Sequence, residues 1–183
     1  MPQHRQRTKR FLTYGMTIYQ LRQRKLTVAA FKKDAELLYC GLNAALARGD
    51  KDTLDKVATV SMAGILNPEI KRIRKVGFGA WQNHGPVTIN VLNLVTAQVE
   101  DPAAAAAGGQ KNFYIAQITT KIVSKQSYAL YSKDSKLLGG DPDKQVDMVE
   151  YVVYERKLTD EAVGWRIAGK IASSNATLPE NST

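Results

Sequence analysis

Apolar residues recur at helical spacing in the first part of the chain. Over residues 28–48 they form an i, i+3, i+7 stripe, which is typical of an amphipathic helix with one buried face. The residues of this stripe are Val28, Phe31, Ala35, Leu38, Leu42 and Ala45. Gly49 follows directly and suits the position just past the end of a helix. The pattern therefore predicts a helix over 28–48.

Two further helical segments are expected after Gly49. Asp52 is a plausible N-cap for the next helix, because its carboxylate can accept a bond from a free backbone N–H. The face of that helix would be lined by Leu54, Val57, Ala58 and Ser61. Asn67 and Pro68 mark a restart, since proline fits the first helical turn. The helical part then ends before Gly77.

From residue 88 onward the pattern alternates with the period of a β-strand. Strands are expected over 88–99, 114–122, 146–157 and 165–171, and residues 127–131 continue the second of these or form another. Residues 103–109 are predicted to be a flexible loop, and residues 133–136 and 139–142 to be turns. Short turns favour antiparallel pairing.

Helices first and antiparallel strands afterwards indicate an α+β fold, with N-terminal helices packed on a curved antiparallel sheet. We expect a basic arm with a short amphipathic helix over 1–27, one α+β domain over 28–173 and a disordered tail over 174–183. The single cysteine, Cys40, excludes an intramolecular disulfide and is expected to be a buried core thiol.

The positive charge of the chain is concentrated at its beginning. The net charge is +9, from 26 basic and 17 acidic residues. Residues 1–33 hold nine of the basic residues and no Asp or Glu, so the remaining chain has 17 of each sign. A neutral body can fold without self-repulsion, while the arm presents a strong field to polyanions.

The arm also has an apolar pattern, with Phe11, Tyr14, Ile18 and Leu21 at helical spacing. A cationic amphipathic helix of this kind has three interpretations. It could bind RNA or an anionic membrane, it could be a retained mitochondrial presequence, or it could pack on the domain with its charges in solvent.

The candidate binding residues for rRNA or an anionic surface are basic and fall in two groups. They are Arg5, Arg7, Lys9, Arg10, Arg22, Arg24, Lys25, Lys32 and Lys33 in the first group, and Lys71, Arg72, Arg74 and Lys75 in the second. The second group has an equally good structural explanation, because cations are favourable near the end of a helix.

The sequence offers no catalytic, metal or cofactor site. The two histidines, His4 and His84, have no ligand set around them, and no phosphate-cradling loop or nucleophile elbow is present. Glu150 and Glu155 lie on the predicted strand 146–157 and suit cross-strand charge pairs. We therefore expect a binding protein with no cofactor and no small-molecule substrate.

Residues 114–171 carry a recognisable series of motifs. It runs through 116–119 (AQIT), 126–131 (QSYALY), 138–140 (LGG), 149–158 (VEYVVYERKL) and 164–171 (GWRIAGKI). This series resembles the superfamily of the C-terminal domain of the inner-membrane translocase subunit 44, and within it the mitochondrial large-subunit ribosomal proteins. The resemblance spans roughly residues 28–172, without the alanine-rich segment, and the arm is not matched residue by residue.

The resemblance implies a cone-shaped fold like nuclear transport factor 2. It implies a place on large-subunit rRNA near the polypeptide exit tunnel, in the mitochondrial matrix at the face of the inner membrane. The implied partners are rRNA, neighbouring ribosomal proteins, and the inner membrane with its insertase. Trp165 and Tyr151, which belong to the motif, are expected to pack in the core, so the arm and residues 71–75 remain the expected functional surface.

Two other functions stay open at this point. An import-motor adaptor or membrane receptor could use the same domain away from the ribosome. A ligand-binding or isomerase-like cone is the other possibility, and it would need an open apolar pocket with a convergent acid or hydroxyl.

Overall fold

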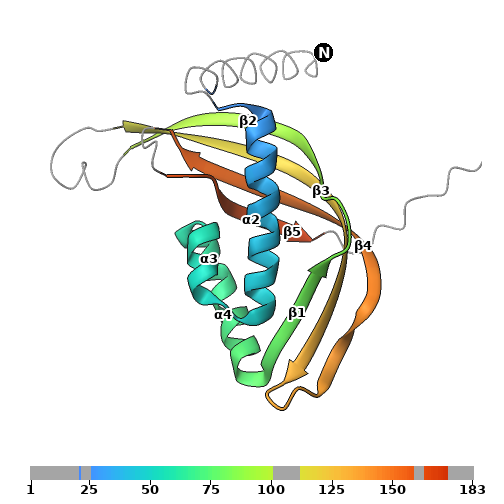
Figure 1. Ribbon diagram of the computed structural model, residues 1–183. Helices are drawn as coiled ribbons and strands as arrows, with labels where there is room; N and C mark the ends of the chain where they lie inside the picture. The colour runs from blue at the N-terminus through green and yellow to red at the C-terminus, as the bar shows by residue number, and fades with distance from the viewer. Residues whose placement is uncertain (1–20, 22–25, 101–111, 159–162, 173–183) are drawn as a thin grey trace, which may run out of the picture.

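The computed structural model describes residue 21 and residues 26–100, 112–158 and 163–172, and these form helices followed by an antiparallel sheet (Figure 1). The helices are α2 (Val28–Arg48), α3 (Lys51–Val57) and α4 (Val60–Val76). The strands are β1 (Gly77–Asn83), β2 (Thr88–Glu100), β3 (Asn112–Ser132), β4 (Leu137–Lys157) and β5 (Arg166–Ala172). The predicted α+β class and the antiparallel pairing are confirmed.

Strand β3 organises the sheet. One side of its C-terminal half pairs with β1, and the same side of its N-terminal half pairs with β2. Its other side pairs with β4, which in turn pairs with β5. The register shifts on β3 between Gln126 and Tyr128, and such bulges bend a strand. The sheet is accordingly curved, and α2 runs along its concave side (Figure 1).

Helix α2 confirms the predicted helix over 28–48 and its end at Gly49. Thr27 caps its start, since the Thr27 hydroxyl accepts a bond from Ala30 N at 3.1 Å. Gly49 has a φ of 68°, a left-handed conformation that glycine adopts without steric cost. The buried stripe includes Tyr39, which is fully buried, whereas the predicted Leu38 is only half-buried.

The expected start of the second helix is wrong by two residues. Asp50, and not Asp52, is the N-cap of α3, and its carboxylate accepts a bond from Thr53 N at 3.1 Å. The helix ends at Val57 because Ala58 and Thr59 join the sheet, where Thr59 N donates to Ile167 O at 2.9 Å. A contact distant in sequence therefore interrupts the expected helical face.

The expected restart at Asn67 and Pro68 is also wrong, because Pro68 lies inside α4. Thr59 starts this helix instead, with its hydroxyl accepting a bond from Met62 N. Proline leaves the carbonyl four residues earlier, that of Gly64, without its helical donor. Gly64 and Pro68 are both exposed, so water can bond to that carbonyl and the helix continues.

Two features of the sheet differ from the prediction. Strand β1 was not expected, because glycine-rich Gly77–Gly79 has low strand propensity. Residues 139–142 were expected to be a turn, but they lie inside β4, on an exposed edge that tolerates Pro142 and the glycines. The turn at 133–136 and the continuation of β3 through 127–131 are confirmed. The predicted loop 103–109 lies outside the described residues.

The core lies between α2 and the concave face of the sheet. Phe31 of α2 meets the rings of Tyr154 and Trp165 edge-on, at centroid distances of 5.3 Å and 5.0 Å. Trp165 is therefore a core residue, as expected. The same expectation for Tyr151 is wrong, because strand alternation places it on the opposite face of β4 from Tyr154, where it is half-buried.

Cys40 is also less buried than expected. It is half-buried and packs against the edge of the core. Burial and then the nearby charge of Glu36 raise the pKa of the Cys40 thiol, which keeps it protonated.

Two glycine substitutions test this packing in opposite directions. A Cβ added at Gly77 would lie 2.1 Å from Tyr131 O, in backbone that cannot move aside. We expect Gly77→Ala to lower the free energy of unfolding by about 2 kcal/mol or more. Gly64→Ala, on the open face of α4, should raise it by about 0.5–1 kcal/mol through helix propensity. Urea unfolding measures the free energy of unfolding of both variants. The same change in both would contradict the close packing of β1 on β3 at Gly77.

Candidate functional site

The predicted basic residues are the first candidates for a binding surface. Seven of them, Arg5, Arg7, Lys9, Arg10, Arg22, Arg24 and Lys25, lie outside the described residues. Lys32 and Lys33 are exposed near the start of α2, and residues 71–75 lie at the C-terminal end of α4. From Lys33 to Gly49, which contacts Arg74, α2 rises roughly 24 Å. The structure therefore places Lys32 and Lys33 at the opposite end of α2 from residues 71–75.

The four cations at the end of α4 are not equivalent. Arg72 donates to both carboxylate oxygens of Glu69, at 2.8 Å and 2.6 Å, and Arg74 donates to Gly49 O at 2.6 Å. The bond from Arg72 lowers the pKa of Glu69 and raises that of Arg72. Lys71 and Lys75 are exposed and have no carboxylate partner among the described residues. These two lysines are the better candidates for a phosphate contact.

A buried polar network lies between α2 and the sheet. Tyr39 Oη donates to Glu150 Oε2 and accepts a bond from Gln126 Nε2 at 2.6 Å. Ser124 Oγ lies 3.0 Å from the same hydroxyl. On its other oxygen, Glu150 forms an ion pair with Lys170 at 3.0 Å. Lys170 is held in turn by Asn43 Oδ1, and its ammonium lies 5.5 Å from the Tyr39 ring centre.

The groups of this network bond to one another. Burial, and then the hydrogen bond to Glu150, raise the pKa of Tyr39 above its usual range, so it remains a neutral donor. Trp81 Nε1 donates a hydrogen bond to the side-chain oxygen of Gln126. In the described part of the chain, the buried side-chain atom without a partner is Asn83 Oδ1, which lies outside the network. The arrangement is that of a structural buried ion pair, with its polar groups mutually satisfied.

Sequence reasoning missed the burial of Glu150. Glu150 and Glu155 were expected to suit cross-strand charge pairs. Glu150 does pair with Lys170 of the neighbouring strand β5, whereas Glu155 accepts a bond from the neutral Gln117. Glu150, however, is 4% exposed and lies on the buried face of β4. The signal was available, because Glu150 alternates in step with Val152 and Tyr154 along the strand.

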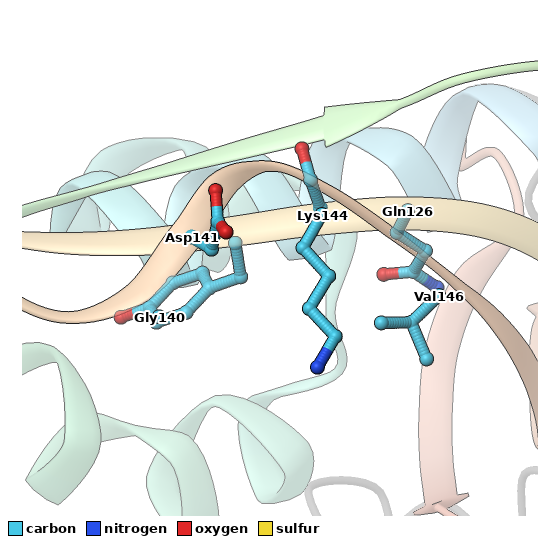
Figure 2. A pocket seen from close by; sticks show the side chains of 7 residues that line it. Gln126, Gly140, Asp141, Lys144 and Val146 are labelled. Carbon is cyan, nitrogen blue, oxygen red and sulfur yellow. The ribbon is translucent and has the colours of Figure 1, made fainter.

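A surface hollow lies where β4 bulges away from β3 (Figure 2). Lys144 lies between Asp141 on one side and Gln126 and Val146 on the other. The hollow is lined by one cation, Lys144, and one anion, Asp141, and the Gln126 amide already bonds within the buried network. Such an open, mixed lining lacks the convergent groups of a catalytic site.

Other kinds of site are not evident in the described residues. Among them, no group of three His, Cys, Asp or Glu side chains is arranged to hold a metal ion. No helix within the described ranges is both long and apolar enough to cross a bilayer.

Comparison with known proteins decides the family. The sequence profile of the Tim44-like domain matches residues 14–172, which is most of the chain. The chain belongs to the Tim44-like domain family. The match confirms the resemblance, which spans roughly residues 28–172, and extends it to residue 14 of the basic arm.

Several curated relatives bear one name. The chain is 25% identical to large ribosomal subunit protein mL45 of Caenorhabditis elegans over 88% of its length, and 28% identical to that of Xenopus tropicalis over 85%. A match to the Bos taurus protein is 32% identical over 44% of this chain. The chain spans 43% and 46% of the length of the first two relatives, so the similarity covers one part of those longer proteins.

The buried ion pair gives a test of the network in this Tim44-like domain. Lys170→Met leaves the Glu150 carboxylate buried without its cation, since the two side chains are only 15% and 5% exposed. We expect a loss of about 3 kcal/mol in the free energy of unfolding, measured by urea denaturation. Adding Glu150→Gln should recover most of it, because no buried charge remains. Lys51→Met, which breaks the exposed pair with Asp55, is the control and should change little.

Proposed function

We propose that the chain is a structural, non-enzymatic component of the mitochondrial large ribosomal subunit. The observation that carries this proposal is the family match together with relatives named as a large ribosomal subunit protein, which align over 85–88% of the chain. The buried network supports it, because its polar groups stabilise the fold and leave no convergent reactive set in the described residues.

The basic arm is the proposed rRNA contact. Seven of the nine cations of residues 1–33 lie in the arm, residues 1–27, which has no carboxylate, and the chain after residue 33 is neutral. Phosphate contacts from such a segment supply affinity independent of sequence. Lys71 and Lys75 are a second proposed contact, because their charges are not used within the described structure. The arm would lie along rRNA near the exit tunnel, and the folded body would face the inner membrane and its insertase from the matrix.

The salt dependence of RNA binding tests the arm. Leu21 is 4% exposed in the core, so deleting residues 1–27 would also damage packing, and charge removal is the cleaner change. Changing Arg5, Arg7, Lys9 and Arg10 to glutamine should reduce the log–log salt slope for duplex RNA by about 0.9 per lost contact. The slope comes from affinity measured across a salt series.

The control uses cations that are already paired. Changing Lys51 and Arg72 to glutamine removes charges held by Asp55 and Glu69, and should alter the slope less per charge. An unchanged slope in the arm variant would end the role proposed for the arm.

The second candidate is an adaptor or receptor that works away from the ribosome. It follows from the resemblance to the C-terminal domain of the inner-membrane translocase subunit 44. Sedimentation of mitochondrial lysate separates the two. We expect the chain to migrate with the large subunit and to remain there in high salt. A chain that stays with the membrane fraction, and leaves the subunit at low salt, would favour the adaptor.

A further inference from the structure

The sheet has a second face, turned away from α2 (Figure 1), and this face carries an apolar stripe. The Tyr154 hydroxyl bonds to α2, so strand alternation turns Val149, Tyr151 and Val153 to the opposite face of β4. Direct partners on β3 and β5 extend the group across three strands. The resulting surface, called the outer stripe below, consists of Val123, Val149, Tyr151, Val153, Gly169 and Ile171.

This apolar pattern is not that of a sheet with one face in solvent. Such a strand alternates between apolar and polar residues, whereas a nearly continuous apolar run is typical of a strand that is covered on both faces. Over residues 148–154 (MVEYVVY), β4 has one charged side chain, Glu150, and it lies on the side of α2. On the outer stripe Tyr151 is half-buried and Ile171 is 69% exposed. The sequence of β4 therefore suits a second layer, which the described residues do not complete.

The dimensions of the outer stripe fit one α-helix. Neighbouring strands lie about 4.8 Å apart, so β3, β4 and β5 together are about 10 Å wide. A helix with its side chains is about 10–12 Å in diameter. Along β4, the distance from Val149 to Val153 is about 13 Å, which equals roughly nine helical residues. A helix of about two to three turns would cover the stripe.

Gly169 leaves room on this surface for a side chain of the partner. It lies directly opposite Val153 on the neighbouring strand. A Cβ added at Gly169 would lie 3.6 Å from Val153 Cβ, which is an ordinary van der Waals contact. Packing within the domain therefore does not require glycine at this position, and the space above it can be filled from outside.

One cation on the stripe indicates the charge of the partner. Lys121 lies directly opposite Tyr151 and is half-buried. Among the described residues, no carboxylate lies within 4.0 Å of its ammonium group. Lys125, on the same face of β3, differs because its ammonium lies 4.0 Å from the Asp147 carboxylate. A carboxylate of the partner would pair with Lys121.

We propose that the outer stripe binds one amphipathic helix of another protein, with apolar side chains on Tyr151 and Ile171 and a carboxylate against Lys121. A second copy of this face fits less well, because it would bury two Lys121 side chains with no acid between them. Nucleic acid would leave the aliphatic side chains in water, and an anionic bilayer would meet the exposed Asp147 beside the stripe. The inference goes beyond the proposed function and does not depend on it, since it follows from the sheet alone.

The test reads the sequence of the partner segment. The photoreactive amino acid p-benzoylphenylalanine replaces Ile171 in the full-length chain, expressed in cells, and Leu37 is the matched control position. Leu37 is 73% exposed but lies on α2. After irradiation, mass spectrometry identifies the cross-linked segment. We expect position 171, and not position 37, to reach a segment with apolar residues at i, i+3, i+4 and i+7 and an acidic residue among them.

A synthetic peptide of that segment is then titrated against the purified chain by fluorescence anisotropy. Lys121→Glu should weaken binding about tenfold, and a peptide with its acidic residue changed to lysine should restore it. Lys125→Glu is the control and should change the affinity little, because Lys125 is exposed and already has Asp147 nearby. Gly169→Leu should also weaken binding, since it fills the space for the partner, while its urea unfolding shows that the domain stays folded.

Several results would overturn the proposal. They are no cross-link from position 171, a cross-link to RNA, lipid or a second copy of the chain, and the same segment reached from both positions. A segment without the helical apolar pattern, or an effect of Lys121→Glu that the charge-reversed peptide does not correct, would count equally against it. The proposed function is decided separately by sedimentation with the large subunit, so either can fail without the other.

Discussion

Helix α2 is fixed to the sheet by two tyrosines that reach in opposite directions. Tyr154 of β4 donates its hydroxyl hydrogen to Ala35 O on α2, at 2.9 Å, while Tyr39 of α2 donates to Glu150 of β4. Both side chains are fully buried, so each hydroxyl needs its partner on the other element. This reciprocal pairing sets both the position and the rotation of α2 within the concave face. The bulges that bend β3 and β4 give the helix the concave face into which these two contacts fix it.

The same pairing leaves the buried polar groups of the core bonded to one another. Glu150 would be costly to bury alone, and Lys170, Tyr39 and Gln126 together complete its hydrogen bonds. An interior whose polar groups bind one another leaves its surfaces as the places for partners. At the end of α4 even the cations divide in this way. Arg72 and Arg74 donate to Glu69 and Gly49, while Lys71 and Lys75 have no carboxylate partner among the described residues.

Much of this fold could be predicted from sequence, and the failures have physical causes. Helix α2, strands β2, β3 and β5 and the second half of β4 carry apolar patterns, which report burial directly. Strand β1 lacks such a pattern because neighbouring backbone lies too close to Gly77 and Gly79 for a side chain to fit. The break at Ala58 depends on Ile167, more than a hundred residues away, which no local pattern contains. For the site, charge located the exposed lysines, but only geometry showed which arginines were already engaged.

The distribution of charge then acquires a structural meaning. A body with 17 charges of each sign after residue 33 can fold around one buried ion pair without net repulsion. The surplus lies within residues 1–33, and its described members, Lys32 and Lys33, are exposed near the start of α2. Had that surplus been spread over the sheet, its repulsion would act on the folded body itself. Its concentration ahead of the fold leaves the proposed anionic partner to balance it.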